Sequence, residues 1–146
     1  MNPRPLDVEV VGHRLRILRE ALDDLEPLRD VKAGQLATEP LTRAAAERLV
    51  QVIVDVAVDV NAHIAVAETG AAPTSARESF TKVAAAGAID ADLADRLAPA
   101  AGLRNVLVHR YADIRVELVA SAVPEVLDGF AAYVRQVADF VARPSE

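Results

Sequence analysis

The sequence contains no cysteine among its 146 residues, and this absence excludes several classes of site. Disulfide bridges, thiolate zinc centres, iron–sulfur clusters and a cysteine nucleophile all require that side chain. Tryptophan is also absent, and only three Phe and two Tyr residues supply aromatic rings. Proteins that stack single-stranded bases depend on aromatic rings, so a stacking platform for nucleic acid is not expected.

Basic side chains are outnumbered in this sequence. There are 16 Lys and Arg residues and 22 Asp and Glu residues, which gives a net charge of −6 and an isoelectric point near 5.1. A chain with this balance is not a general binder of polyanions, so any contact with nucleic acid must be local. The sequence also contains no glycine-rich phosphate loop, no His-Glu-x-x-His pattern and no serine in a nucleophile elbow.

Long uncharged apolar runs are missing as well. The longest apolar segment, residues 50–66, is interrupted by Asp55, Asp59 and His63, so we expect no membrane-spanning helix. Residues 1–7 contain no apolar core of the kind found in secretory signals, and the cytoplasm is the expected location.

The spacing of apolar residues predicts an all-α fold. The length fits one domain over residues 1–146, with an ordered core over about residues 6–141. Helix-breaking residues divide the chain into five segments with helical periodicity, joined by short loops and by a connection over residues 28–38. The expected helical segments are residues 6–25, 41–69, 75–86, 90–109 and 113–141. We therefore expect an up-and-down bundle of about five helices.

Residues 50–60 are open to two interpretations. Valine occupies every second position there, which is typical of a half-buried strand. Polar residues recur at every fourth position, at Gln51, Asp55, Asp59 and His63, and this spacing makes one stripe on a helix. Eleven residues would be long for a strand and no helix breaker lies nearby, so we favour a helix.

Local signals predict where the helices begin and end. The expected N-caps are Asp7, Ser75 and Asp90. The glycines expected to end helices are Gly70 and Gly87. Glu78 follows Ser75 at the spacing of a capping box, in which the Glu side chain reaches back to the N-cap. A bend or break is expected near Pro99 and Gly102, and Pro124 is expected to open the last section of the final helix.

One dense polar run remains in this apolar chain, at residues 104–111 with the sequence RNVLVHRY. The guanidinium of Arg104 offers a phosphate a planar set of donors and is always charged. The imidazole of His109 can accept a proton and return it. Together they suit RNA cleavage by the ribose 2′-hydroxyl, because His109 can remove its proton while Arg104 neutralises charge on the phosphoryl oxygens. This route needs no metal ion.

Helical geometry restricts how these two side chains can meet. Five residues at about 100° each place Arg104 and His109 about 140° apart, whereas Asn105 and His109 share a face. Two copies of the chain could combine an Arg and a His from each in one cleft, or the helix could end near His109 and redirect it. A purely structural role is the alternative, with Arg104 paired to an Asp, His109 bonded to a carbonyl and Tyr111 packed by its ring.

Residues 104–111 resemble the Arg-x4–6-His signature of HEPN domains, with Asn105 as the polar residue that follows the arginine. Tyr111, two residues after the histidine, makes the run similar to the HepT branch of these domains. Three further blocks resemble the same branch in sequence or character: residues 46–51, 59–64 and 80–97. The resemblance covers about residues 6–140, which is nearly the whole chain.

This resemblance implies a helical homodimer that acts as a metal-independent ribonuclease toxin without a cofactor. Its substrate would be RNA, with tRNA as one candidate, and its partner would be a minimal nucleotidyltransferase antitoxin. By analogy Arg104 and His109 would carry the cleavage, and Asn105 would orient His109 or the phosphate. Tyr111 would be the hydroxyl to which the antitoxin attaches AMP, whose bulk and negative charge would block and repel RNA.

The stripe of Asp55, Asp59 and His63 is a second candidate cluster. Its members span about 12 Å along a helix axis, which is too long for one metal ion, so we expect no metal site. Asp59 and His63 are instead expected to support the site, with Asp59 bonded to His63 or to an arginine in the cleft.

Two rivals to the nuclease come from other functional classes. A HEPN-type bundle could be a non-catalytic binding partner of a nucleotidyltransferase, and the net acidity favours this alternative because it weakens attraction for RNA. The chain could also be a helical interaction protein in which the polar run is structural.

Overall fold

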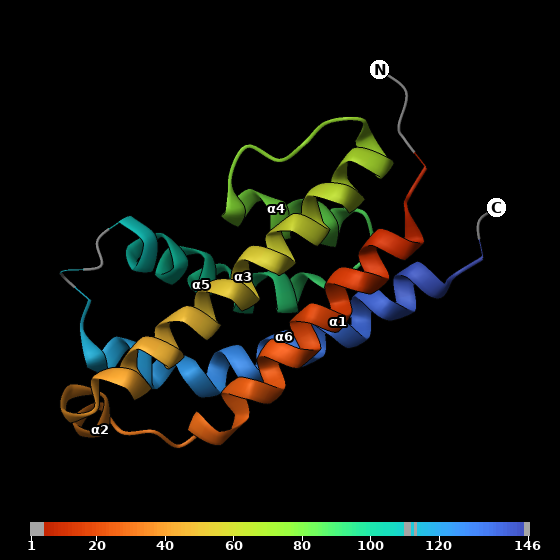
Figure 1. Cartoon of the computed structure of the whole chain (residues 1–146). Helices are drawn as coiled ribbons and strands as arrows, with labels where there is room; N and C mark the ends of the chain where they lie inside the picture. Colours follow the sequence, from red (N-terminus) through yellow and green to blue (C-terminus); the bar gives the residue numbers. More distant parts are fainter. Residues whose placement is uncertain (1–4, 110–111, 113, 145–146) are drawn as a thin grey trace.

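The computed structural model describes residues 5–109, 112 and 114–144, and in this part of the chain the regular structure is helical, without strands (Figure 1). The elements are α1 (Val8–Leu25), a 3₁₀ turn (Glu26–Leu28), α2 (Ala33–Thr38), α3 (Pro40–Thr69), α4 (Ala76–Ala85), α5 (Ala91–His109) and α6 (Val116–Ala142). The predicted all-α bundle is therefore confirmed. It has one helix more than expected, because α2 forms where the sequence indicated only a connection.

The helix ends carry the caps that the sequence indicates. Backbone N–H groups donate to the side-chain oxygens of three N-caps: Asp7 (3.1 Å), Ser75 (3.1 Å) and Asp90 (2.7 Å). Gly70 and Gly87 follow α3 and α4 with φ angles of +79° and +88°, which a residue with a side chain rarely adopts. The capping box differs from the prediction in one detail. The Glu78 carboxylate was expected to reach back to the N-cap residue Ser75, but it accepts a hydrogen bond from the Thr74 hydroxyl.

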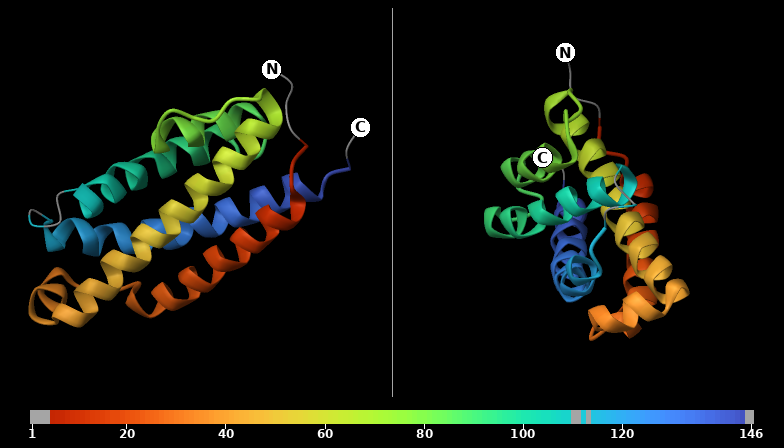
Figure 2. Two further views of the ribbon diagram at one scale, coloured as in Figure 1. Left: turned by 45° about the horizontal axis from the view of Figure 1, so that its top comes forward. Right: turned by 90° about the vertical axis from the view of Figure 1, so that its left-hand side faces the viewer.

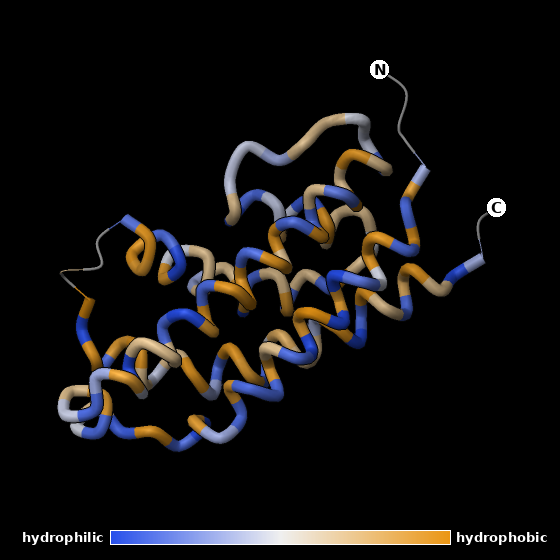
Figure 3. Tube along the Cα trace, in the orientation of Figure 1, coloured by the Kyte–Doolittle hydropathy of each residue, from blue (hydrophilic) through white to orange (hydrophobic). Residues whose placement is uncertain are grey.

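The alternating segment is helical, as predicted, and forms the middle of α3. A strand there would have been a fragment without partners, whereas the 30-residue helix packs against α1, α2, α4, α5 and α6. By length and composition alone α3 could cross a membrane. Its buried residues, including Val50, Ile53 and Val60, instead contribute to the core of the bundle, and the hydropathy-coloured trace shows apolar positions recurring along every long helix (Figure 3).

The predicted break near Pro99 and Gly102 and the predicted new section at Pro124 are both wrong. α5 runs without interruption through Pro99 and Gly102, and Pro124 lies inside α6 without opening a new section. A proline removes one intrahelical hydrogen bond, but packing on both sides of it can hold the helix together. Leu97 and Leu103 are both buried on either side of Pro99, which provides this support for α5.

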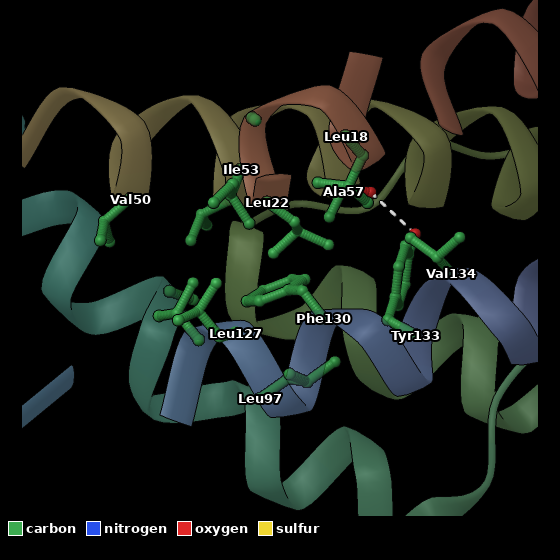
Figure 4. Close-up of a cluster of buried hydrophobic side chains, with 14 of the residues drawn as sticks. Leu18, Leu22, Val50, Ile53, Ala57, Leu97, Leu127, Phe130, Tyr133 and Val134 are labelled. Atoms are coloured by element: carbon green, nitrogen blue, oxygen red, sulfur yellow. Dashed lines mark hydrogen bonds between the residues drawn. The ribbon is translucent and has the colours of Figure 1, made fainter. Parts of the chain in front are cut away.

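The bundle has α4 and α5 on one side and α1 on the other, with α3 and α6 between them (Figure 2). Side chains from α1 and α3 meet those of α6 in the core (Figure 4). Three aromatic rings pack edge to face there, with centroids 5.9–6.1 Å apart: Phe80, Phe130 and Tyr133. α5 and α6 approach closely at Gly129, where an added Cβ would lie 2.8 Å from the Leu97 side chain.

A buried polar network joins α3, α4 and α6. The Tyr133 hydroxyl donates to Asn61 Oδ1 (2.5 Å) and also lies 3.1 Å from the Ala57 carbonyl oxygen, the contact drawn in Figure 4. Asn61 Nδ2 donates to Ser79 Oγ (3.0 Å), and the Ser79 hydroxyl donates to the Ala76 carbonyl (2.6 Å). Burial raises the pKa of Tyr133 well above its usual value, so its hydroxyl stays protonated at neutral pH.

Candidate active site

Arg104 lies in the last third of α5 and faces α3. Its Nε donates to Asp55 Oδ1 over 2.5 Å, across 49 residues of sequence. The side chains of Arg104 and Asp55 are 29% and 38% exposed, so the ion pair lies at the edge of the core in contact with solvent. If the polar run had a purely structural role, Arg104 was expected to pair with an Asp. The contact with Asp55 is such a pair.

The pairing with Asp55 engages only one edge of the guanidinium. Nη1 makes a weak contact of 3.4 Å with the Oδ1 of its neighbour Asn105. Among the described residues, neither Nη1 nor Nη2 has a carboxylate partner. Asp55 therefore fixes the direction of the guanidinium and leaves N–H groups that could bind the oxygens of a phosphate.

His109 is the last residue of α5, and its side chain is exposed. Because α5 is continuous from Arg104 to His109, the two side chains differ by about 140° around the helix and about 7.5 Å along it. The structure therefore does not bring Arg104 and His109 together within one chain. Asn105, also exposed, precedes His109 by four residues and shares its face of α5.

The two predicted supporting residues lie further along α3. Asp59 forms an ion pair with Arg14 of α1 at 2.8 Å, so its arginine partner belongs to α1 and not to the polar run. His63 follows Asp59 by one turn and is half-buried. Within the described ranges, no group of three acidic or histidine side chains is arranged to hold a metal ion.

Tyr111 and Arg110 lie outside the described residues, so the predicted AMP acceptor is not placed. The second tyrosine of the chain, Tyr133, has no exposed surface, and its hydroxyl is bonded within the core. A modifying enzyme cannot reach Tyr133 without unfolding the bundle.

Sequence reasoning missed the partner of Arg104. Asp55 belongs to the same polar stripe as Asp59 and His63, and the stripe was the signal that could have identified it. A stripe shows which residues share a helix face but not which distant helix packs there. The contact with α5 depends on how the bundle closes.

A family model described as ribonuclease HepT-like matches residues 18–137, a range that includes the whole polar run. The chain belongs to the HepT-like ribonuclease family. A tRNA nuclease HepT from Aphanizomenon flos-aquae is 29% identical over 140 residues, which cover 96% of this HepT-like chain and 93% of that relative. An mRNA nuclease HepT from Shewanella oneidensis is 32% identical over 77 residues, which cover 53% and 58%.

Solved structures share the fold of this HepT-like chain. A tri-AMPylated HEPN toxin of Shewanella oneidensis, in complex with an MNT antitoxin, superposes with a TM-score of 0.78 and 21% identity. The match covers 89% of this chain and 97% of that toxin. A toxin–antitoxin structure with AMP-PNP matches with a TM-score of 0.79 and 20% identity, over 90% and 98% of the two chains. At these identities the matches show a common fold.

Proposed function

We propose that this protein is a metal-independent endoribonuclease toxin in which Arg104 and His109 carry out the cleavage. The observation that carries the proposal is the family match, which spans both residues, together with the partly exposed guanidinium of Arg104 held at one edge by Asp55. Both relatives are named nucleases of RNA, one of tRNA and one of mRNA, which supports RNA as the substrate class.

The cleavage proceeds by attack of a ribose 2′-hydroxyl oxygen on the adjacent phosphorus. His109 accepts the hydroxyl proton, the bond from phosphorus to the 5′ oxygen breaks, and that oxygen takes up a proton returned by the protonated His109 or by water, which leaves a 2′,3′-cyclic phosphate and a 5′-hydroxyl end. Arg104 donates to the non-bridging oxygens, whose negative charge grows in the transition state. Asn105 orients His109 or the phosphate, and Asp59 and His63 support the site from α3.

The separation of the two groups on α5 favours a site that is built from two copies of the chain. We propose a homodimer in which the cleft receives an arginine from one protomer and a histidine from its partner. The 140° between Arg104 and His109, with α5 intact between them, supports this arrangement because one protomer cannot direct both groups at one phosphate.

Tyr111 is the proposed site of control. A nucleotidyltransferase antitoxin transfers AMP to its hydroxyl, and the added phosphate and nucleoside repel RNA and fill the cleft. Two observations support this assignment: a similar toxin fold carries AMP groups in a complex with its antitoxin, and the other tyrosine, Tyr133, is inaccessible. The pair is expected to act in the cytoplasm, where its RNA substrates lie.

The decisive test uses purified protein with tRNA and with total RNA in the presence of EDTA. The wild type should cut RNA and leave cyclic phosphate ends. Arg104→Ala and His109→Ala should each lower the cleavage rate by about a hundredfold or more, the range typical of losing a charge stabiliser or a general base. Circular dichroism and thermal unfolding should show an intact helical fold in both variants.

Several results would contradict this proposal. Full cleavage by a folded Arg104→Ala or His109→Ala variant would remove these residues from the chemistry. Activity that EDTA abolishes would contradict the metal-independent route. In a mixture of the two inactive variants, partial recovery of cleavage is expected, because a mixed dimer contains one intact arginine and one intact histidine in its cleft.

Modification has its own test. Incubation with ATP and the nucleotidyltransferase should add one or more AMP units to the wild type, and Tyr111→Phe should gain no mass. AMP found on the Tyr111→Phe variant would show that the acceptor lies elsewhere.

A second candidate is a non-catalytic partner of the nucleotidyltransferase, favoured by the net charge of −6. It predicts that the protein binds nucleotide or the antitoxin while leaving RNA intact under the same conditions.

A further inference from the structure

Arg14 of α1 and Arg104 of α5 reach α3 from opposite sides and meet neighbouring carboxylates of its polar stripe. Arg104 Nε donates to Asp55, and Arg14 Nη1 lies 2.8 Å from Asp59 Oδ2. Asp55 and Asp59 are four residues apart, so they follow one another by about 6 Å along the helix axis. Because α3 lies between α5 and α1, the two arginines border the same face of α3 (Figure 1).

Arg14 is engaged less completely than two other arginines that join distant parts of the bundle. Arg29 and Arg43 each donate Nε to a glutamate and an Nη group to a distant element. Arg14 instead meets Asp59 through Nη1, and its Nη2 has no carboxylate partner among the described residues. In the part of the chain that the structure describes, Arg14 Nε is the buried side-chain polar atom without a hydrogen-bond partner.

Stability does not account for this placement of Arg14. The side chains of Arg14 and Asp59 are 33% and 49% exposed, and an ion pair so accessible to water contributes little to the free energy of unfolding. A buried N–H group without an acceptor is itself unfavourable. A native protein that keeps such a group calls for another role of the side chain, and a guanidinium with N–H groups to spare suits an anion.

The charged side chains on this face of α3 differ in sign from the chain as a whole. Arg48 lies on the same stripe, seven residues before Asp55, and its exposed side chain forms no ion pair within the described ranges. Together with Arg14 and Arg104 it makes three arginines against two aspartates, whereas the whole chain has a net charge of −6. A polyanion bound to so acidic a protein needs a local excess of positive charge of this kind.

We propose that Arg14 binds the RNA phosphate next to the one held by Arg104, and that it thereby aligns the strand along α3. The proposal rests on the proposed function, because it takes RNA as the ligand and Arg104 as the contact to the scissile phosphate. Consecutive phosphates of an RNA strand are separated by a distance similar to one turn of an α-helix. Two guanidiniums held against neighbouring turns of α3 can therefore contact both phosphates at once.

Arg14→Gln tests the proposal in cleavage of purified tRNA. The phosphate at Arg14 does not react, so the contact is the same in the ground state and in the transition state. KM should therefore rise about tenfold, while kcat stays within about threefold of wild type. Arg14→Lys should recover part of the loss, because lysine keeps the charge but not the planar set of donors. A wild-type KM in Arg14→Gln would overturn the proposal.

Asp59→Asn is the matched control, because it breaks the same ion pair and leaves the arginine in place. If Arg14 contacts RNA directly, Asp59→Asn should change KM by less than about threefold. Equal increases of KM in the two variants would assign the effect to the ion pair and would overturn the proposal. Arg29→Gln controls for the loss of an arginine elsewhere: Arg29 is 34% exposed and pairs with Asp128 of α6, so KM should stay at the wild-type value.

The salt dependence of RNA binding supplies a readout that a structural role would not move. Binding of a mixed-sequence single-stranded oligoribonucleotide is measured in the His109→Ala protein, which should not cut it. Each phosphate contact on a single strand adds about 0.7 to the slope of log affinity against log salt concentration. Adding Arg14→Gln to this protein should lower the slope by about that amount, and adding Asp59→Asn should leave it as it is.

The outcomes separate this proposal from the proposed function. An unchanged slope in the Arg14→Gln protein, beside normal cleavage by wild type, would overturn the role of Arg14 and leave the nuclease standing. Binding that depends on Arg14, without any cleavage by wild type, would count against the nuclease and leave the phosphate contact standing.

Discussion

Two polar clusters attached to α3 differ in how many of their hydrogen-bond donors and acceptors have partners. In the first, Asn61, Ser79 and Tyr133 are fully buried, and each is hydrogen-bonded within the core. In the second, Arg104 and Asp55 are partly exposed, and Asp55 engages only the Nε edge of the guanidinium. Their attachment points, Asn61 and Asp55, are six residues apart on the same helix.

The difference shows how one helix serves both stability and a site. A buried network with matched donors and acceptors fixes the packing of its helices but has no capacity left for a ligand. A partly exposed ion pair contributes little to stability, because water competes for it, but it presents oriented donors to solvent. Substitutions in the two clusters should therefore separate folding from activity.

The largest effect on stability is expected for Asn61→Ala. The substitution removes the acceptor of the Tyr133 hydroxyl and the donor to Ser79 and leaves a small cavity, so the free energy of unfolding should fall by about 2–4 kcal/mol. Urea denaturation measures this loss. Cleavage per folded molecule should stay within twofold of wild type, and a selective loss of cleavage would erase the distinction between the clusters.

Asp55→Asn should have the opposite profile. The amide keeps an oxygen near Arg104 Nε but loses the charge that fixes the guanidinium, so kcat for RNA cleavage should fall about tenfold. The free energy of unfolding should change by less than about 1 kcal/mol. Asp55→Glu should recover part of the rate. Wild-type kcat in Asp55→Asn would show that Arg104 needs no orientation from α3.

Alkaline pH should weaken the buried cluster. Burial raises the pKa of Tyr133 above its value of 10.0 in the unfolded chain, so above pH 10 the unfolded state loses a proton that the folded state retains. Stability is thus fully present below pH 10 and should fall by about 1.4 kcal/mol per pH unit above it. Urea titrations from pH 8 to pH 11 should show a steeper decline for wild type than for Tyr133→Phe. If stability fell equally steeply with pH in wild type and in Tyr133→Phe, the loss at alkaline pH could not be assigned to Tyr133.

The smallest effect is expected for Asp59→Asn. This substitution breaks the ion pair with Arg14, whose side chains are 33% and 49% exposed, so stability should fall by at most about 1 kcal/mol. Because Asp59 only supports the site, Asp59→Asn should lower RNA cleavage by less than about threefold, a smaller loss than in Asp55→Asn. A larger loss of cleavage than in Asp55→Asn would show that Asp59 matters more for cleavage than Asp55 does.

Most of the fold could be predicted because its signals are local. Asp7, Ser75 and Asp90 act within one turn of chain, and the left-handed backbone at Gly70 and Gly87 depends on the glycine itself. The helix α2 was missed because its six residues have little periodicity and bury only Leu36. Pro99 and Pro124 were misjudged because tertiary packing overrides the local cost of a proline.

The candidate site was only partly predictable for the opposite reason. Arg104 and His109 were identified because they belong to one short run with recognisable chemistry. Asp55 lies 49 residues from Arg104, which donates to its carboxylate, and Ile114 lies 71 residues from Arg43, which donates to its carbonyl oxygen. The periodicity of the sequence gives no sign of contacts between residues so far apart. Only the packing of α3 against α5 and against the start of α6 brings these residues together.

The enclosed position of Tyr133 has a practical consequence for spectroscopy. In a chain without tryptophan, the near-ultraviolet signal comes from two tyrosines and three phenylalanines, and the phenol ring of Tyr133 packs edge to face against Phe80 and Phe130 in the core. The circular dichroism band of Tyr133 in the near ultraviolet therefore reports whether the core is intact. Loss of tertiary structure can be followed by this band in an unlabelled sample, separately from a loss of RNA cleavage.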